Sequence, residues 1–259
     1  MKYRIFIALL LAGIASGARA DDIKWKEQKS QHFLIYYNKA DQDFIDTVTK
    51  AAEEYYTEIS QSLGVRRFKS WTWEDRARIY IYDDQDAYVS EGKQIGWSHG
   101  VAYTKQKVIR TFPSANGFFD SIMPHELTHI IFHELVGYQS LIPSWFEEGI
   151  AMYHEKARSW GAHVVVRKAI KGGTFISLPE LSQMRLTADT KQETVNLFYA
   201  ESASAVNFLM TKQGEERFFR LCQGLTSGTS FESSFESAYV QYRTIDKLNK
   251  AWMEFLKND

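Results

Sequence analysis

The chain's clearest chemical signal is the run His125-Glu126-Leu127-Thr128-His129. On a helix, residues four apart lie on one face, so both imidazoles could reach the same metal ion. Glu126 follows the first histidine directly and could take a proton from a water molecule that the ion activates. Two imidazoles and an adjacent carboxylate therefore predict a hydrolase with one zinc ion (Zn2+), and we expect peptides to be its substrates.

A catalytic zinc site normally has a third protein ligand and keeps one position for water. In a metzincin, a glycine and a histidine would follow at the positions that Phe132 and Leu135 occupy, so that pattern fails. Ligation by cysteines fails as well, because the chain has a single cysteine. A glutamate from the next helix remains, and Glu148 is present there beside a competitor, Glu147.

The segment from Pro143 to Tyr153 has the sequence Pro-Ser-Trp-Phe-Glu-Glu-Gly-Ile-Ala-Met-Tyr. With the HExxH run before it, this segment resembles the gluzincin metallopeptidases. In the large zinc aminopeptidases and in shorter thermolysin-like relatives, a Trp-Leu-x-Glu-Gly-x-Ala-x-Tyr element follows HExxH. The resemblance implies that zinc is bound by His125, His129 and Glu148, and that Glu126 is the general base.

A weaker resemblance concerns Tyr199, which stands near the start of an expected helix where the aminopeptidases carry Tyr-x-x-Gly. It implies that the Tyr199 hydroxyl stabilises the oxyanion, and the alternative is an ordinary packed tyrosine. The aminopeptidases also carry a Gly-x-Met-Glu-Asn strand whose glutamate holds the free amino terminus of the substrate. Gly100 to Thr104 occupies a comparable place without a glutamate. This difference favours an endopeptidase whose substrate backbone lies along an edge strand.

Two further residues near the motifs could be mistaken for ligands. His133 lies one turn beyond His129, and we expect it to be exposed or capped. Glu155 could hold a histidine ring in place, but a solvated acid is the default expectation. Two alternatives to a peptidase stay open: a non-catalytic binding or scaffold protein on the same fold, and a zinc hydrolase of another amide or ester.

The first twenty residues have the pattern of a secretory signal peptide. Lys2 and Arg4 precede an apolar run over residues 5–14, and Ala18-Arg19-Ala20 offers small residues for cleavage after Ala20. The run is short for a bilayer span, so we rank a membrane anchor below a signal and expect no stable membrane span after its removal. The protein is thus expected in the periplasm or secreted.

Composition and periodicity predict an α+β protein. Hydrophobic residues make up 44% and charged residues 24% of the chain, and the net charge of -1 gives nucleic-acid binding no support. We expect strands over 32–37, 76–82, 95–102 and 107–112, and helices over 41–63, 117–135, 144–156, 193–211, 215–224, 232–242 and 245–257. Pro124 either lies in the first turn of its helix or follows a kinked turn.

The resemblance to the gluzincins implies that these elements form a thermolysin-like (gluzincin) peptidase domain over residues 21–259. Its N-terminal α/β lobe, about 21–137, would hold a mixed sheet with an edge strand. Its C-terminal lobe, about 138–259, would be mostly helical.

Overall fold

The computed structural model describes residues 24–64, 71–72, 74–92, 99–113, 117–138, 141–156, 161–187 and 189–258. The expected signal peptide lies outside the described residues, and so does the first part of the strand expected over 95–102. By its internal contacts the chain divides into two compact units, Met1–Glu134 and Leu135–Asp259.

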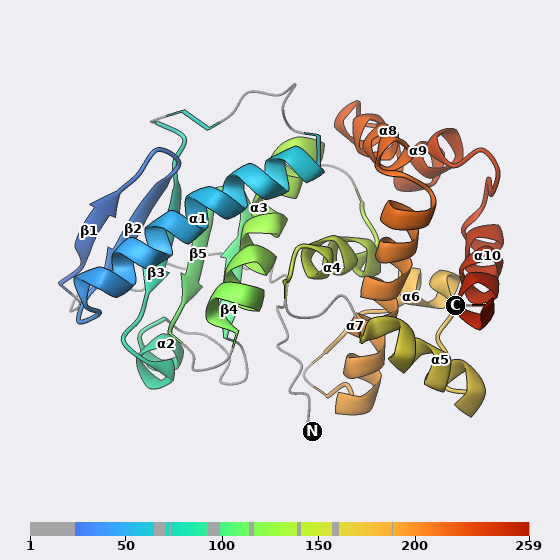
Figure 1. Ribbon diagram of the computed structural model, residues 1–259, viewed down its shortest axis with the longest axis horizontal. Coiled ribbons are helices and arrows are strands. Elements are labelled where there is room, and N and C mark those ends of the chain that lie inside the picture. The colour runs from blue at the N-terminus through green and yellow to red at the C-terminus, as the bar shows by residue number, and fades with distance from the viewer. Residues whose placement is uncertain are drawn as a thin grey trace. The chain divides into compact units, whose positions relative to one another are not determined.

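The first unit is built on a mixed five-stranded sheet with the strand order β1-β2-β3-β5-β4 (Figure 1). Strands β2, β3 and β5 run parallel, while β1 pairs antiparallel with β2 and β4 pairs antiparallel with β5. Among the described residues, β4 therefore forms one edge of the sheet. The strands are β1 (Lys26–Lys29), β2 (Phe33–Tyr37), β3 (Ala77–Ile81), β4 (Gly100–Tyr103) and β5 (Val108–Thr111).

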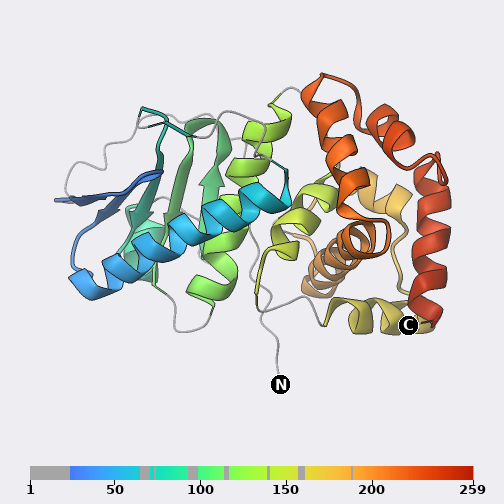
Figure 2. The same cartoon turned by 45° about the horizontal axis from the view of Figure 1, so that its top comes forward.

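One face of this sheet carries the core of the first unit. Ile35, Ile79 and Ile109 are buried and pair across the three parallel strands, so they share that face. Helix α1 (Gln42–Ser62) packs on β2 and crosses the sheet (Figure 2). Asp41 caps the start of α1, because its carboxylate accepts a hydrogen bond from the Phe44 amide at 2.8 Å.

The helix with the HExxH run begins through a π-helical turn. In η3 (Phe118–Ile122) the amide of Ile122 donates to the carbonyl of Gly117, five residues back, at 3.0 Å. Helix α3 (Met123–Val136) follows, with Pro124 in its first turn. Proline cannot donate to the carbonyl five residues before it, which belongs to Phe119. The hydroxyl of Tyr55 in α1 donates to that carbonyl at 2.8 Å instead.

The second unit is helical, with α7 (Gln192–Asn207) packed against α4 (Ser144–Tyr153) and α5 (Ala162–Gly172) (Figure 1). Gly149 lets α4 and α7 approach closely, because an added Cβ there would collide with the Ser202 carbonyl and the Val206 side chain. The π-turn η4 (Phe208–Lys212) extends α7. The other helices are α6 (Leu178–Gln183), α8 (Glu215–Thr226), α9 (Phe231–Ala238) and α10 (Ile245–Asn258).

The expected α+β class is confirmed, with a mixed sheet in the N-terminal half and a mostly helical C-terminal half. Five elements were not expected. They are strand β1, the 3-10 turn η2 (Thr104–Gln106) and the helices α2 (Gln85–Ser90), α5 and α6. The helix expected over 232–242 ends early, at Ala238. None of the helices in the described ranges combines the length and the apolar character that crossing a membrane requires.

Candidate metal centre

Helix α3 brings together the three residues of the HExxH run that could do chemistry. His125, Glu126 and His129 are buried, with exposed fractions of 4%, 2% and 2%. The spacing of four residues turns both imidazoles to one side of the helix, and their Nε2 atoms lie 3.2 Å apart. Two ring nitrogens that converge in a buried place can bind one metal ion.

The protonation state of His129 suits a ligand. Burial, together with neighbouring His125 and His133, holds the pKa of the His129 imidazole well below its usual range. The ring is therefore neutral near pH 7, which is the form that binds metals. Within the same turn the Thr128 hydroxyl donates to the Pro124 carbonyl at 2.7 Å, so it does not compete for the ring nitrogens.

Glu148 in α4 supplies the carboxylate that the sequence suggests as the third ligand. One ligand atom from each of His125, His129 and Glu148 lies within 4.8 Å of the other two. Glu148 has an exposed fraction of 5%, whereas Glu147 is only half-buried. Glu148 is thus the glutamate that could bind a metal together with the two imidazoles, and its role as a ligand stays a prediction.

The donor set fits a zinc ion. Zinc in proteins takes imidazole nitrogens and carboxylate oxygens, and a catalytic site has three such ligands. Burying two imidazoles and a carboxylate costs free energy unless they are paired or coordinate a metal. A bound ion would account for this concentration of polar groups on otherwise apolar helices.

Three other sequence predictions near the motifs have mixed outcomes. Tyr199 lies in α7 with an exposed fraction of 1%, and its ring contacts that of Phe198. This burial suits a packed tyrosine, and the oxyanion role stays a prediction. His133 was expected to be exposed or capped, and exposure is wrong: only 7% of it is exposed, since its turn of α3 lies in the core. Glu155, expected in solvent, is buried at 4%.

The sequence did not predict a close contact between Gly100 and Glu126. A Cβ placed on Gly100 would lie 3.2 Å from Oε1 of Glu126 and 3.3 Å from its Cγ. Strand β4 therefore runs directly beside the carboxylate of the HExxH run. A glycine within a strand is a signal of such close approach, although it does not identify the neighbour.

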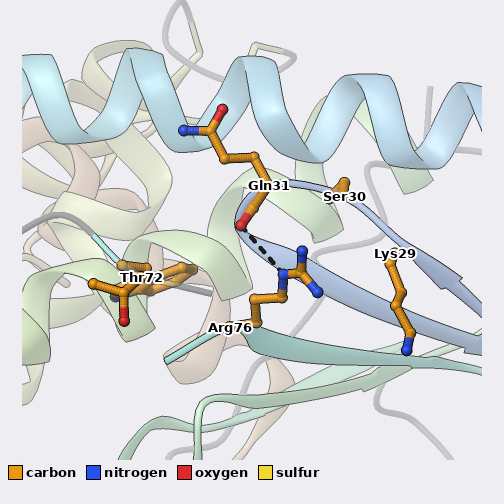
Figure 3. Close-up of a pocket in the computed structure, with 6 residues that line it drawn as sticks. Lys29, Ser30, Gln31, Thr72 and Arg76 are labelled. Atoms are coloured by element: carbon orange, nitrogen blue, oxygen red, sulfur yellow. Dashed lines mark hydrogen bonds between the residues drawn. The ribbon is translucent and has the colours of Figure 1, made fainter. Parts of the chain in front are cut away.

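A separate hollow of about 520 Å³ lies where β3 begins (Figure 3). Its two cationic side chains already have partners. Nε of Arg76 donates to the Gln31 carbonyl at 3.3 Å, and Nζ of Lys29 lies 3.0 Å from Glu27. The hollow contains no residue of the metal cluster, so it adds nothing to the chemistry of that centre. Its lining residues are Lys29, Ser30, Gln31, Trp71, Thr72 and Arg76.

Comparison with known proteins gives one family. The family model described as the Peptidase MA superfamily matches residues 65–258, which cover most of the chain. The match includes both the HExxH run and the Glu-Gly element of α4. No curated protein matches the chain.

Proposed function

The chain belongs to the Peptidase MA superfamily, and from this premise we propose that it is a zinc-dependent peptidase. In this proposal His125, His129 and Glu148 hold one zinc ion and Glu126 is the general base. The observation that carries the proposal is the buried cluster of ligand atoms within 4.8 Å of one another. Membership in the superfamily supports peptide hydrolysis over other zinc chemistry.

In the proposed mechanism, Glu126 carries one proton from the attacking water to the leaving amine. When bound, a zinc ion supplies Lewis acidity, which lowers the pKa of a water molecule to about 7 and polarises a carbonyl group. The Glu126 carboxylate accepts the proton of the attacking water and passes it to the leaving amine. Its burial removes competing bulk water, so the carboxylate can deliver that proton to the amine. The Tyr199 hydroxyl is our candidate donor to the developing oxyanion.

We propose an endopeptidase rather than an aminopeptidase. The support is the sequence of β4, which has no glutamate between Gly100 and Thr104 to bind a free amino terminus. Strand β4 lies at an edge of the sheet as far as the structure describes it, and an extended peptide can add to such an edge. Internally quenched peptides with acetylated amino termini should be cleaved, whereas amino-acid 4-nitroanilides should not.

The first experiment measures zinc content and peptide cleavage on the mature chain and on Glu126→Gln. We expect one zinc per chain in both proteins, because Glu126 is not a ligand. Cleavage of casein or of a peptide library should fall by about 10²–10⁴-fold in the variant, the usual contribution of a general base. Equal cleavage by both proteins would show that Glu126 is not the base, and absence of zinc from both would refute the metal assignment.

A second candidate function is binding without catalysis on the same fold, or hydrolysis of another amide or ester. The intact set of His125, Glu126, His129 and Glu148 argues against a protein that has lost activity. Zinc in both proteins with no peptide cleavage in either would favour this second candidate.

Export is also proposed, from the signal pattern in residues 1–20. Cell fractionation should find the chain in the periplasm or the medium, with Asp21 as its first residue. An intact amino terminus in the cytoplasm would contradict export.

A further inference from the structure

Gly100 is the first residue of β4 and faces the helix that carries the HExxH run. It pairs with Thr111 of β5, and Ala102, on the same side of the strand, pairs with buried Ile109. The strand start is held in place by the Thr111 hydroxyl, which donates to the His99 carbonyl at 2.8 Å. Gly100 is thus fixed on the core face of the sheet.

The reason for glycine at this position is space and not backbone conformation. The backbone of Gly100 is not among the positive-φ glycines, so an L-amino acid could adopt it without strain. An added Cβ would instead meet the Ile122 Cγ2 at 2.7 Å and the Glu126 Oε1 at 3.2 Å. The Ile122 side chain would have to move to accommodate it, and the Glu126 carboxylate would have to shift by a few tenths of an ångström.

The absence of a side chain also shapes the surroundings of the carboxylate. Oε1 and Cγ of Glu126 lie 3.2 and 3.3 Å from the place that a Cβ of Gly100 would take, so strand β4 limits the space on one side of this side chain. A general base must stay within hydrogen-bond reach of the proton that it takes. Small displacements matter, since a misplacement of 1 Å can cost about 10²-fold in rate.

We propose that Gly100 is a positioning residue for Glu126: its missing side chain lets β4 lie against the carboxylate and sets where that carboxylate points. The inference rests on the proposed peptidase function. Under that function, an extended peptide would pair with the edge of β4. Because β4 lies beside Glu126, this peptide would lie next to the general base. Gly100 would then act on the chemical step through Glu126 and not on substrate affinity.

The test compares Gly100→Ala with a double variant that relieves the other collision. Ile122→Leu removes the Cγ2 methyl group that would lie at 2.7 Å, so the close contact that remains in the Gly100→Ala/Ile122→Leu protein is the one with Glu126. Ile122→Leu alone controls for repacking, because this swap conserves volume. Gly172→Ala is a matched control, since an added Cβ at Gly172 meets nothing within 4 Å. Zinc content, unfolding midpoint, kcat and KM are measured for each on an internally quenched peptide.

We expect kcat of Gly100→Ala to fall about tenfold or more, with KM within about twofold of wild type and one zinc per chain retained. The double variant should show the same loss, while both control variants keep the wild-type kcat. A wild-type kcat in Gly100→Ala, or its recovery in the double variant, would overturn the proposal, because the effect would then be packing against Ile122. Failure of the double variant to fold would likewise assign Gly100 to packing.

Failure of the underlying function gives a different result. If wild type itself shows no cleavage that depends on Glu126, the peptidase proposal fails before the role of Gly100 is reached. If wild type is active and the double variant is equally active, only the positioning role fails.

Discussion

His129 and His133 are separated by one turn of α3, and both are buried, yet only His129 belongs to the ligand cluster. We therefore expect His129→Gln to lose zinc and His133→Gln to keep it. The loss of a direct ligand should lower zinc affinity by more than the roughly 10–100-fold typical of outer-shell partners. Metal analysis after dialysis against a weak chelator measures both variants. Equal loss from His133→Gln would mean that the ligand set is wrong.

A single hydrogen bond supports the entry into the helix that carries the histidines. The Phe119 carbonyl accepts from Tyr55 at 2.8 Å, at the place where Pro124 offers no amide. Tyr55→Phe should lower the free energy of unfolding by about 1 kcal/mol, because a partly buried carbonyl loses its hydrogen-bond partner. Urea unfolding followed by circular dichroism measures this change.

Tyr37→Phe is the control for this variant. Tyr37 is buried like Tyr55, but its hydroxyl donates to the exposed side chain of Gln42, which can turn to water instead. We expect a smaller loss, about 0.5 kcal/mol. If both substitutions lowered the free energy of unfolding equally, the hydrogen bond to the Phe119 carbonyl would have no special importance for stability.

At the scale of elements, the packing of α4 against α7 explains why a glycine, Gly149, follows Glu148. Its place between α4 and α7 leaves no room for a Cβ, and the nearest atom is a backbone oxygen of Ser202 that cannot turn away. Gly149→Ala should therefore lower the free energy of unfolding by about 3 kcal/mol or prevent folding. Gly172→Ala, in open space, should be neutral or slightly stabilising. Thermal unfolding compares them, and a Gly149→Ala protein as stable as wild type would contradict the argument.

The sequence predicted most of the long periodic elements, although it missed the amphipathic helix α5, and it missed the short elements without a pattern. Helix α1 and strands β2 and β3 were found because buried side chains repeat at helical or alternating spacing along them. Strand β1 has the sequence Lys-Glu-Gln-Lys and is mostly exposed, so no alternation marks it. Its pairing with β2 is a tertiary contact, which a local pattern cannot contain.

The candidate site divides in the same way. Spacing within one helix or one motif predicted His125, His129 and Glu148 as a group that could bind a metal, because such spacing is a property of the local chain. The contact between Gly100 and Glu126 joins a strand to a helix that follows it in the chain, and it depends on how sheet and helix pack. No sequence pattern encodes that distance.

At the scale of the whole molecule, the family match and the fold do not begin at the same residue. The match starts at residue 65, after β1, β2 and α1, which are all part of the first unit. Those elements nevertheless complete the core of that unit, since α1 packs on β2 and Tyr55 reaches the turn before α3. A chain that began at residue 65 would lose these contacts and would leave the edge of β3 that pairs with β2 without its partner.

The free energy of unfolding should depend on pH through two buried ionisable side chains, Glu201 and His154. Glu201 in α7 is fully buried, with one carboxylate oxygen accepting from the Ile176 amide at 2.9 Å. Burial raises the pKa of this carboxyl to about 8, and the negative charge of nearby Glu180 raises it as well. The hydrogen bond from the Ile176 amide lowers the pKa, but by less than burial raises it. The shift at His154 has the opposite sign, because burial lowers the pKa of its imidazole to about 4. Its stabilising contribution is therefore lost as the pH falls, whereas that of Glu201 is lost as the pH rises.

The sign of the Glu201 effect follows from linkage. A carboxyl with a raised pKa in the folded state is protonated there while the unfolded chain has already lost the proton. Its stabilising contribution is complete below about pH 4.5 and is lost as the pH rises through 8, at up to about 1.4 kcal/mol for each pH unit. Glu201→Gln cannot ionise, so its free energy of unfolding should fall less than that of wild type between pH 5 and 8. Urea unfolding across this range measures the difference, and parallel curves for the two proteins would show that Glu201 is ionised in the folded chain.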